Sequence, residues 1–407
     1  MIWGGSEPWV SGLRVVALGG GHGLAASLGA LRRLTDDLTA VVTVADDGGS
    51  SGRLRRDYGV LPPGDLRMAL AALCRDDEWG TTWSQVVQHR FGGDRELAGH
   101  AVGNLLIVAL WDLLGDTVAG LDWVGRLLGT TGRVLPMAAV PLDIVAEVVG
   151  ADPARPTEVS TVRGQVECAT TPGRVRSITL VPPDPPAVPE AVQAVLDADW
   201  IVFGPGSWFT SVLPHLMVPE LSAALHVTAA RRLVVLNLVP QPGETGGFSP
   251  HEHLEVLAGH APGLNVDVVL ADTKAAGAAA LDDLVKAAGV LGARLVLADV
   301  AAADGTPHHD PERLAQAYAQ IFARAFEPEG PGQGRGRGGL GGQGGLGGRA
   351  VPPSRGVPGG SSPGERRSNG DDRRGEGRAQ PGGGDQAVLP QGGGLHAAEV
   401  RGRPAPG

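Results

Sequence analysis

Residues 41–70 have the sequence VVTVADDGGSSGRLRRDYGVLPPGDLRMAL, and this stretch decides the fold class. An apolar run closes on two adjacent aspartates, a Gly/Ser loop follows at once, and a basic cluster leads to Pro-Pro-Gly-Asp. Strands of an open α/β sheet end in polar loops of this kind, because ligands bind beyond the carboxyl ends of the strands. The stretch therefore predicts a buried strand followed by a ligand-binding loop.

Apolar runs of the same kind recur on both sides of this stretch. They lie at residues 13–20, 38–46, 200–204, 233–239, 266–272 and 294–300. Segments with helical spacing separate them, such as residues 24–34. Strands that are apolar throughout suit a parallel sheet covered on both faces. The predicted fold class is α/β, a doubly wound, mostly parallel Rossmann-like sheet with a small inserted β-rich region near residues 140–180.

The composition divides the chain into three parts. Residues 1–12 are predicted to be a flexible N-terminus and residues 13–326 a folded domain. Residues 327–407 are rich in Gly, Pro and Arg and hold no Phe, Trp or Tyr, so they cannot bury enough apolar surface to offset the entropy lost on ordering. We predict a disordered tail, which either stays solvated or makes weak contacts with RNA or a partner.

Charge and cysteine content exclude several function classes. The formal net charge is −10, and residues 330–407 carry 11 Arg against 6 Asp and Glu, which leaves about −15 on the preceding body. A body this acidic is not expected to bind nucleic acid, since phosphate contacts need a dense Lys/Arg face. Two cysteines cannot build a disulfide framework or a cysteine-rich zinc site. With no recognisable signal peptide and no apolar run of membrane length, we expect a cytoplasmic protein without a membrane span.

A glycine-rich turn follows the first predicted strand. It consists of Gly19, Gly20, Gly21, His22 and Gly23. Bare backbone N–H groups at a helix N-terminus bind anions, and glycines let a phosphate approach closely. The alternative is a turn that only packs strand against helix, and His22 is equally compatible with a phosphate contact and with a solvated loop.

A richer loop follows the second predicted strand. Its candidate ligand residues are Asp46, Asp47, Gly48, Gly49, Ser50, Ser51 and Arg53. One carboxylate could hold a ribose hydroxyl or a magnesium ion, while the hydroxyls, amides and arginine could take phosphate oxygens. The alternative is an Asp-Gly turn before a basic, solvated helix.

Two further segments carry polar residues near predicted helix starts. Asp65 is a candidate N-cap, and Arg67 in the first helical turn opposes the helix dipole unless it faces an anion. His100 and Asn104 lie four residues apart, so they share a helix face and form either a ligand wall or a helix cap. No second ligand pair at metal spacing accompanies them, so a zinc site is not predicted.

Two loops in the second half resemble the first ones in composition. Their candidate ligand residues are Gly204, Gly206 and Ser207 after one strand, and Asn237, Gln241, Glu244 and Thr245 after the next. Hydroxyl, amide and carboxylate groups suit the hydroxyls of a sugar or the edge of a base. Several such loops at strand ends together predict one cleft for a phosphorylated, polar ligand.

The motifs ADDGGSSGRL, PPGD and FGPGSWFTSVLPHLMVP resemble those of the gluconeogenesis-factor (YvcK-like) family, within the CofD-like 2-phospho-L-lactate transferase superfamily. The resemblance implies a cytoplasmic nucleotide-sugar-binding domain for UDP-N-acetylglucosamine or a similar UDP-sugar. It also implies a regulatory role in cell shape and envelope synthesis during gluconeogenic growth, exerted through a protein partner, with no required cofactor. A homodimer is left open.

The same resemblance implies places for individual residues. Residues 19–23 would cradle the diphosphate, Asp46 and Asp47 would lie beside the nucleotide or metal, and residues 204–207 with Asn237 and Glu244 would line the rest of the cleft. His22 departs from the threonine that family members often have. Pro242 departs from the usual Gln-Asn-Gly-Glu-Thr pattern.

Two functional classes remain open on the sequence. The first is a UDP-sugar sensor that catalyses nothing. The alternative is a phospholactate-type transferase, in which Asp46 would hold magnesium against a nucleotide-diphosphate-activated donor. NAD-dependent hydride transfer fits the first glycine turn but not the later loops.

Overall fold

The computed structural model describes residues 12–241 and 243–324. The predicted tail, most of the predicted flexible N-terminus, and Pro242 lie outside the described residues. The domain boundaries proposed from composition therefore stay predictions.

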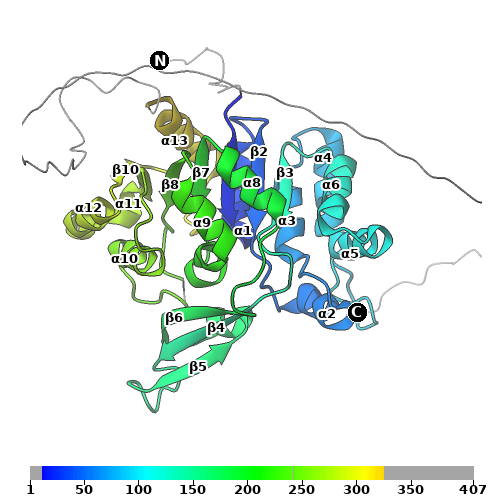
Figure 1. The fold of residues 1–407 in the computed structure, drawn as a ribbon, viewed down its shortest axis with the longest axis horizontal. Coiled ribbons are helices and arrows are strands. Elements are labelled where there is room, and N and C mark those ends of the chain that lie inside the picture. The colour runs from blue at the N-terminus through cyan, green and yellow to red at the C-terminus, as the bar shows by residue number, and fades with distance from the viewer. Residues whose placement is uncertain (1–11, 242, 325–407) are drawn as a thin grey trace, which may run out of the picture. The chain divides into compact units, whose positions relative to one another are not determined.

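A seven-stranded parallel sheet forms the centre of the domain (Figure 1). Its strands are β1 (Val15–Gly19), β2 (Leu38–Val42), β3 (Arg133–Pro136), β7 (Trp200–Phe203), β8 (Arg231–Val235), β9 (Val268–Asp272) and β10 (Arg294–Ala298). The strand order is β10-β9-β8-β7-β1-β2-β3, and Val15 of β1 pairs with Leu38 on one side and Trp200 on the other. This arrangement confirms the predicted α/β class and its doubly wound, parallel sheet.

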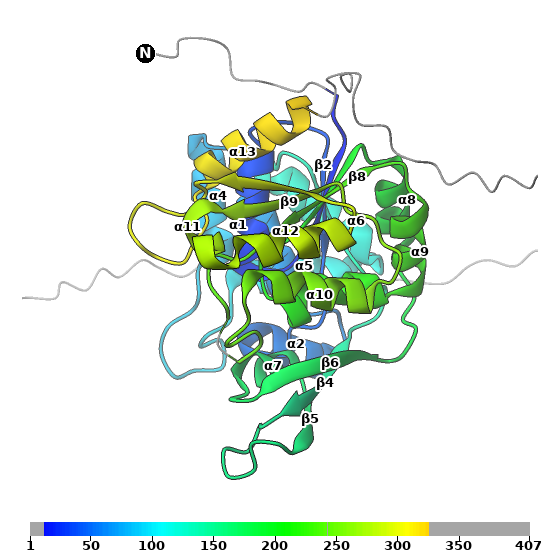
Figure 2. The same cartoon turned by 90° about the vertical axis from the view of Figure 1, so that its left-hand side faces the viewer.

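Helices cover both faces of this sheet, as its continuously buried strands require (Figures 1 and 2). They are α1 (Gly21–Leu31), α2 (Gly49–Tyr58), α3 (Gly64–Ala72), α4 (Glu78–Gln88), α5 (Val102–Leu114), α6 (Thr117–Leu128), α7 (Gln165–Thr170), α8 (Pro189–Asp197), α9 (Pro219–Val227), α10 (Pro250–His260), α11 (Thr273–Ala276), α12 (Leu281–Val290) and α13 (Pro311–Arg324). Helices α8 and α9 lie on one face, and α1 and α13 on the other. The last helix returns to the first one, where Ser27 and Tyr318 share a buried hydrogen bond of 2.8 Å.

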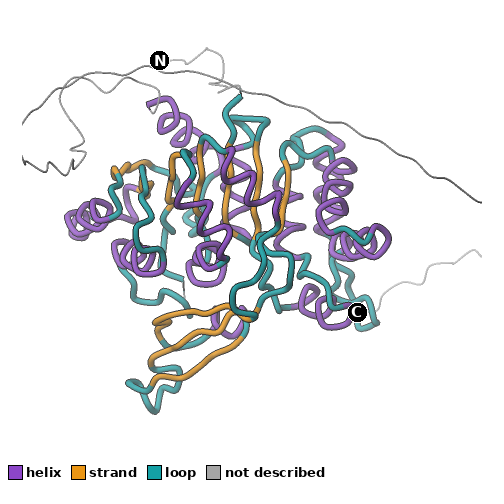
Figure 3. The backbone as a smooth tube through the Cα atoms, viewed as in Figure 1, coloured by secondary structure: helices purple, strands orange, loops and turns teal. Residues whose placement is uncertain are grey.

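A separate three-stranded antiparallel sheet confirms the predicted β-rich insertion. It consists of β4 (Asp143–Val149), β5 (Val159–Arg163) and β6 (Arg174–Val181), in the order β5-β4-β6. Figure 3 shows it as a unit beyond one end of the main sheet. The short helix α7 connects β5 to β6. We call this unit, residues 143–181, the insertion.

The strand order places a topological switch point between β1 and β7. From β1 the chain runs outward to β2 and β3, and then returns to β7 and runs outward to β10 on the other side. Loops that follow the two central strands diverge at such a point and leave a crevice between them. The two glycine-rich turns identified in the sequence follow these two strands, so the fold brings them together.

Membrane-spanning helices and disulfide bonds are both absent from the part of the chain that the structure describes. Within residues 12–324, apart from residue 242, no helix is long and apolar enough to cross a membrane. Cys74 and Cys168 are both buried and unpaired, and burial raises the pKa of each thiol to about 11.

Candidate functional site

The two glycine turns touch each other at the switch point. Helix α1 begins inside the first turn, and a Cβ atom on Gly23 would lie 2.3 Å from the Pro205 carbonyl oxygen and 2.5 Å from Gly206 Cα. Both contacts are with backbone, so nothing there can move aside cheaply. Only glycine at residue 23 allows the two turns to come this close. We call this contact of Gly23 with Pro205 and Gly206 the seam.

Asn237, at the end of β8, holds the second turn in place. Its amide nitrogen donates to the Gly206 carbonyl oxygen at 2.7 Å, and its amide oxygen accepts from the Gly206 N–H at 2.9 Å. Both ends of the amide are therefore occupied within the protein. A direct contact between Asn237 and a ligand stays a prediction.

Glu244 is a buried carboxylate that anchors the segment after β7. It accepts hydrogen bonds from the Ser207 hydroxyl, from the Thr210 hydroxyl at 2.7 Å and from the Phe209 N–H at 3.3 Å. Burial raises the pKa of Glu244, while these donors lower it. Thr245 is fully buried, and its hydroxyl accepts from the Gln241 N–H at 2.9 Å. These contacts hold the segment after β7 and the loop after β8 together beside the site.

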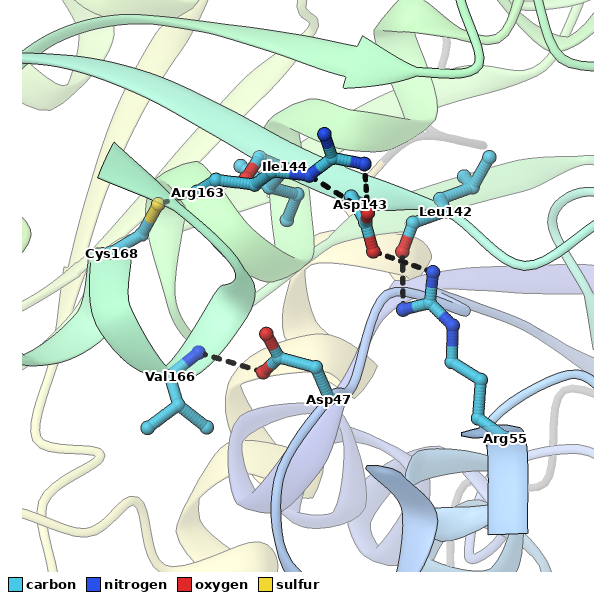
Figure 4. A network of polar contacts seen from close by, with 8 residues as sticks. All are labelled: Asp47, Arg55, Leu142, Asp143, Ile144, Arg163, Val166 and Cys168. Carbon is cyan, nitrogen blue, oxygen red and sulfur yellow. Dashed lines mark hydrogen bonds and ion pairs between the residues drawn. The ribbon is translucent and has the colours of Figure 1, made fainter. Parts of the chain in front are cut away.

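The two adjacent aspartates after β2 face different parts of the protein. Asp46 accepts from the Gly48 N–H at 2.9 Å, and its other oxygen would lie 2.5 Å from a Cβ on Gly64, at the start of α3. Asp47 accepts from the Val166 N–H at 3.0 Å, at the start of α7 (Figure 4). Asp46 is therefore the acid beside the candidate ligand site, and Asp47 joins the loop to the insertion.

An ion-pair network strengthens this join (Figure 4). Arg55 on α2 donates to the Leu142 carbonyl oxygen at 2.9 Å and pairs with Asp143, which also pairs with Arg163 at 2.6 Å. On the other wall, a Cβ on Gly243 would lie 2.0 Å from the Ala169 carbonyl oxygen of α7. The insertion therefore contacts both the loop after β2 and the loop after β8.

Four helices begin close together around Asp46. Gly64 of α3 abuts Ser51 of α2, and the Ala101 N–H at the start of α5 donates to the Ser50 hydroxyl at 3.4 Å. The N-cap residues of α1, α2, α3 and α5 are Gly20, Gly48, Pro63 and Ala101, and none provides a side-chain cap. We call this region, the starts of these four helices with Asp46, Asp65 and Arg67, the helix junction. The helix dipoles at these four starts favour an anion.

Asp65 does not cap α3 as the sequence suggested. The N-cap is Pro63, and the Asp65 carboxylate lies in the first turn and accepts from the Gly21 N–H instead. Burial, with the nearby charge of Asp46, raises the pKa of Asp65 to about 7. The glycine turn thus lies directly against a carboxyl group that is half protonated near neutral pH.

A chain of hydrogen bonds runs through the helix junction. The Arg67 Nε–H donates to Asn104 Oδ1 at 2.9 Å, Asn104 Nδ2 donates to the Ser50 hydroxyl at 3.0 Å, and Ser50 lies 3.1 Å from His100 Nδ1. The direction of the Ser50–His100 hydrogen bond depends on the tautomer of the His100 ring. Burial lowers the pKa of His100, and it lowers that of Arg67 to about 10. Predicted from separate motifs, these four residues form one unit.

Two predicted arginines, Arg53 and Arg67, have different positions at the junction. Arg53 donates to the Ala98 carbonyl oxygen at 2.8 Å and so holds the segment before α5. Arg67 is 3% exposed, and its Nη1 atom has no hydrogen-bond partner among the described residues. A buried guanidinium nitrogen left free at four helix starts is a candidate anion ligand.

A cleft of about 630 Å³ opens on the other side of the glycine turns. We call it the switch-point cleft. Its lining includes the predicted residues His22, Gly23, Gly206, Asn237 and Gln241. It also includes Pro307, His308 and His309, from the loop between β10 and α13, which the sequence did not single out.

The donor set is compatible with a magnesium ion only in part. No cluster of three or more His, Cys, Asp or Glu residues suited to a metal occurs within the described ranges. Asp46 and Asp65 supply two carboxylates, and magnesium is often held by one or two carboxylates plus substrate phosphates and water. The pair therefore fits magnesium that arrives with a phosphorylated ligand.

A family model, curated relatives and a solved structure were each found to be similar to this chain. The model of the 2-phospho-L-lactate transferase CofD family matches residues 15–303. The chain is 55% identical over 318 residues to the "Putative gluconeogenesis factor" of Mycobacterium tuberculosis, covering 77% of this chain and 92% of that protein. It is 33% identical over 261 residues to the "Gluconeogenesis factor" of Bacillus subtilis, covering 64% and 79%.

A solved structure shares the fold. The crystal structure of a UPF0052 family member from Bacillus halodurans superposes with a TM-score of 0.65 at 30% sequence identity, covering 75% of this chain and 98% of that one.

Proposed function

The chain belongs to the CofD family and is related to the gluconeogenesis factors, and we propose that it is a regulatory protein that binds a UDP-sugar such as UDP-N-acetylglucosamine. The observation that carries the proposal is the position of residues 19–23 between two unlike surfaces. One side, at Gly20 and Gly21, faces the helix junction. The other side, at His22 and Gly23, lines the switch-point cleft.

A nucleoside diphosphate attached to a sugar matches this pair of surfaces. The diphosphate would lie against the helix starts and the Nη1 of Arg67, where negative charge is favoured. Gly49 and Ser51 would add backbone and hydroxyl donors from α2. The Asp46 carboxylate would accept a ribose hydroxyl, so we expect Asp46→Asn to weaken binding by about 1–3 kcal/mol.

Several features favour binding without turnover. The polar side chains beside the site mostly satisfy one another: Ser50 with His100, Asn104 with Arg67, and Ser207 with Glu244. The names of the relatives support a role in gluconeogenic growth. We propose that this protein acts there on cell shape and envelope synthesis through a protein partner, in the cytoplasm.

Isothermal titration of the full chain with UDP-N-acetylglucosamine, with and without magnesium, tests this function. We expect binding without magnesium and recovery of the intact ligand afterwards. Absence of any binding, or binding that strictly requires the metal, would contradict the proposal.

A second candidate function is a phospholactate-type transferase, favoured by the Asp46–Asp65 pair and by the name of the family model. These carboxylates would hold magnesium, which would neutralise charge on the transferring phosphate. Since the pKa of Asp65 is about 7, metal-dependent binding should strengthen as the pH rises through neutrality. Titration with GDP and magnesium at pH 6 and pH 8 would reveal it.

A further inference from the structure

The switch-point cleft differs chemically from a phosphate site. Its lining contains histidines, prolines, small residues and aliphatic side chains, and no Asp, Glu, Lys or Arg. Pro205, Pro240 and Pro307 offer flat apolar surfaces from three different loops. Such a wall suits a neutral ring rather than a charged group.

Two polar atoms in this lining lack partners. The side-chain oxygen of Gln241 and Nε2 of His309 are both buried, and neither makes a hydrogen bond within the described residues. Buried polar groups are nearly always hydrogen-bonded, and each one left unpaired costs about 1–3 kcal/mol. Two such atoms in one cleft indicate that a ligand supplies the missing partners.

The protonation state of His309 defines which partner it needs. The backbone carbonyl of Leu236 lies near the ring and favours a proton on it, and a proton on Nδ1 leaves Nε2 as the unprotonated nitrogen. Burial lowers the pKa of His309 to about 4, so the ring is neutral at physiological pH. Nε2 is therefore an acceptor, like the oxygen of Gln241.

We propose that Gln241 and His309 recognise neighbouring hydroxyl groups on the sugar of the bound UDP-sugar. This inference rests on the proposed function and adds the orientation of the ligand, with the diphosphate at the helix junction and the sugar in the switch-point cleft. Two neutral acceptors beside flat apolar surfaces match a sugar ring, whose hydroxyls donate while its apolar face packs.

The uracil base fits this pair of acceptors less well. Its hydrogen-bonding edge has one N–H donor between two carbonyl oxygens, so a second protein acceptor would oppose a carbonyl. A guanine edge offers two adjacent N–H donors and is the alternative source of the same chemistry. The experiment below separates these two sources.

The experiment is a titration of the full chain with UDP-N-acetylglucosamine, UDP and GDP. The variant His309→Asn keeps a donor in the place of Nδ1 for Leu236 but removes the Nε2 acceptor. Gln241→Leu removes the second acceptor at similar volume and guards against misfolding of the first variant. His226→Asn, on the exposed part of α9, is the matched control.

We expect each cleft variant to weaken UDP-N-acetylglucosamine binding about tenfold and to change UDP binding less than twofold, while the control changes neither. Equal losses for UDP and the UDP-sugar, or no loss for either, would overturn the orientation and leave UDP-sugar binding standing. A wild-type preference for GDP that both cleft variants abolish would assign the cleft to a guanine edge. A wild-type protein that binds none of the three would overturn the proposed function together with this inference.

Discussion

The helix junction and the switch-point cleft lie on two sides of the same glycine turn, but their side chains differ in charge and in hydrogen bonding. The junction gathers ionisable groups and four helix starts without side-chain caps, and it links its side chains into a hydrogen-bonded chain. The cleft has no Asp, Glu, Lys or Arg in its lining, and two of its polar atoms have no hydrogen-bond partner among the described residues. The contrast teaches that the two surfaces would suit different ends of one ligand, a charged end at the junction and a neutral end in the cleft.

The largest expected effect concerns the proton on Asp65. Its pKa of about 7 in the folded protein exceeds that of an unfolded aspartate, near 4, so between these values the folded state keeps a proton that the unfolded chain has lost. Stability should therefore fall as the pH rises from 4 to 7, by up to about 4 kcal/mol, and then level off. Urea unfolding across this range, compared with Asp65→Asn, measures the slope.

The variant Asp65→Asn should lack this decline, while Asp94→Asn, at an exposed position, should retain it. Equal slopes of stability against pH in the wild type and in Asp65→Asn would show that the junction does not raise the pKa of Asp65.

Arg67→Met should change the helix junction and leave the switch-point cleft unchanged. Losing the buried guanidinium should weaken UDP and UDP-N-acetylglucosamine equally, by about 1.5–3 kcal/mol, because the proposed contact is with the diphosphate that both ligands share. Isothermal titration checks both ligands, and Arg33→Met, in the turn after α1, is the control. A loss confined to the UDP-sugar would reverse the assignment of the two surfaces.

Gly23→Ala should disturb the seam between the surfaces. The added Cβ would meet backbone at 2.3 Å, so we expect about 1–3 kcal/mol of destabilisation and weaker binding of both ligands. Gly29→Ala in the same helix is a matched control, since its Cβ would meet only Pro311 at 3.6 Å. That control should stabilise the protein by about 0.5–1 kcal/mol through helix propensity. If thermal unfolding gave a stability change of the same sign for both variants, close contact of Gly23 with the second turn would be contradicted.

Asp47→Ala should have the smallest effect and should act on the insertion. The Val166 N–H loses its acceptor, at a cost of about 1 kcal/mol, so amides of α7 should exchange with solvent faster. Hydrogen exchange read by mass spectrometry measures this, with β9 as an internal reference. Unchanged protection of α7 would show that Gly243 and the Arg55–Asp143 pair hold the insertion without Asp47.

The sequence predicted most of the main sheet because its strands are continuously apolar. It missed β3, a four-residue strand that ends at a proline, because so short a segment has no periodicity to detect. It treated residues 48–52 as a loop, since Gly and Ser are poor helix formers, whereas α2 begins at Gly49 through contacts with α3 and α5.

Site residues close to a strand end were visible in the sequence, and distant ones were not. Asp46 and Gly204 follow apolar runs directly, so their neighbourhood could be inferred. His309 lies in a polar turn, far along the chain from Gln241, and only the return of the loop after β10 brings both into one cleft. Whether Asp47 or Asn237 contacts a ligand stays a prediction, because their side chains already bond within the protein.

The return of α13 to α1 has a consequence for how this protein is made. The hydroxyl groups of Ser27 and Tyr318 meet in the core although they are 291 positions apart in the chain. On the ribosome, the first helix emerges long before its partner, so one apolar side of it stays uncovered while the whole sheet is translated. A premature stop between β8 and α13 would therefore leave an open core exposed to chaperones and proteases, rather than a smaller working domain.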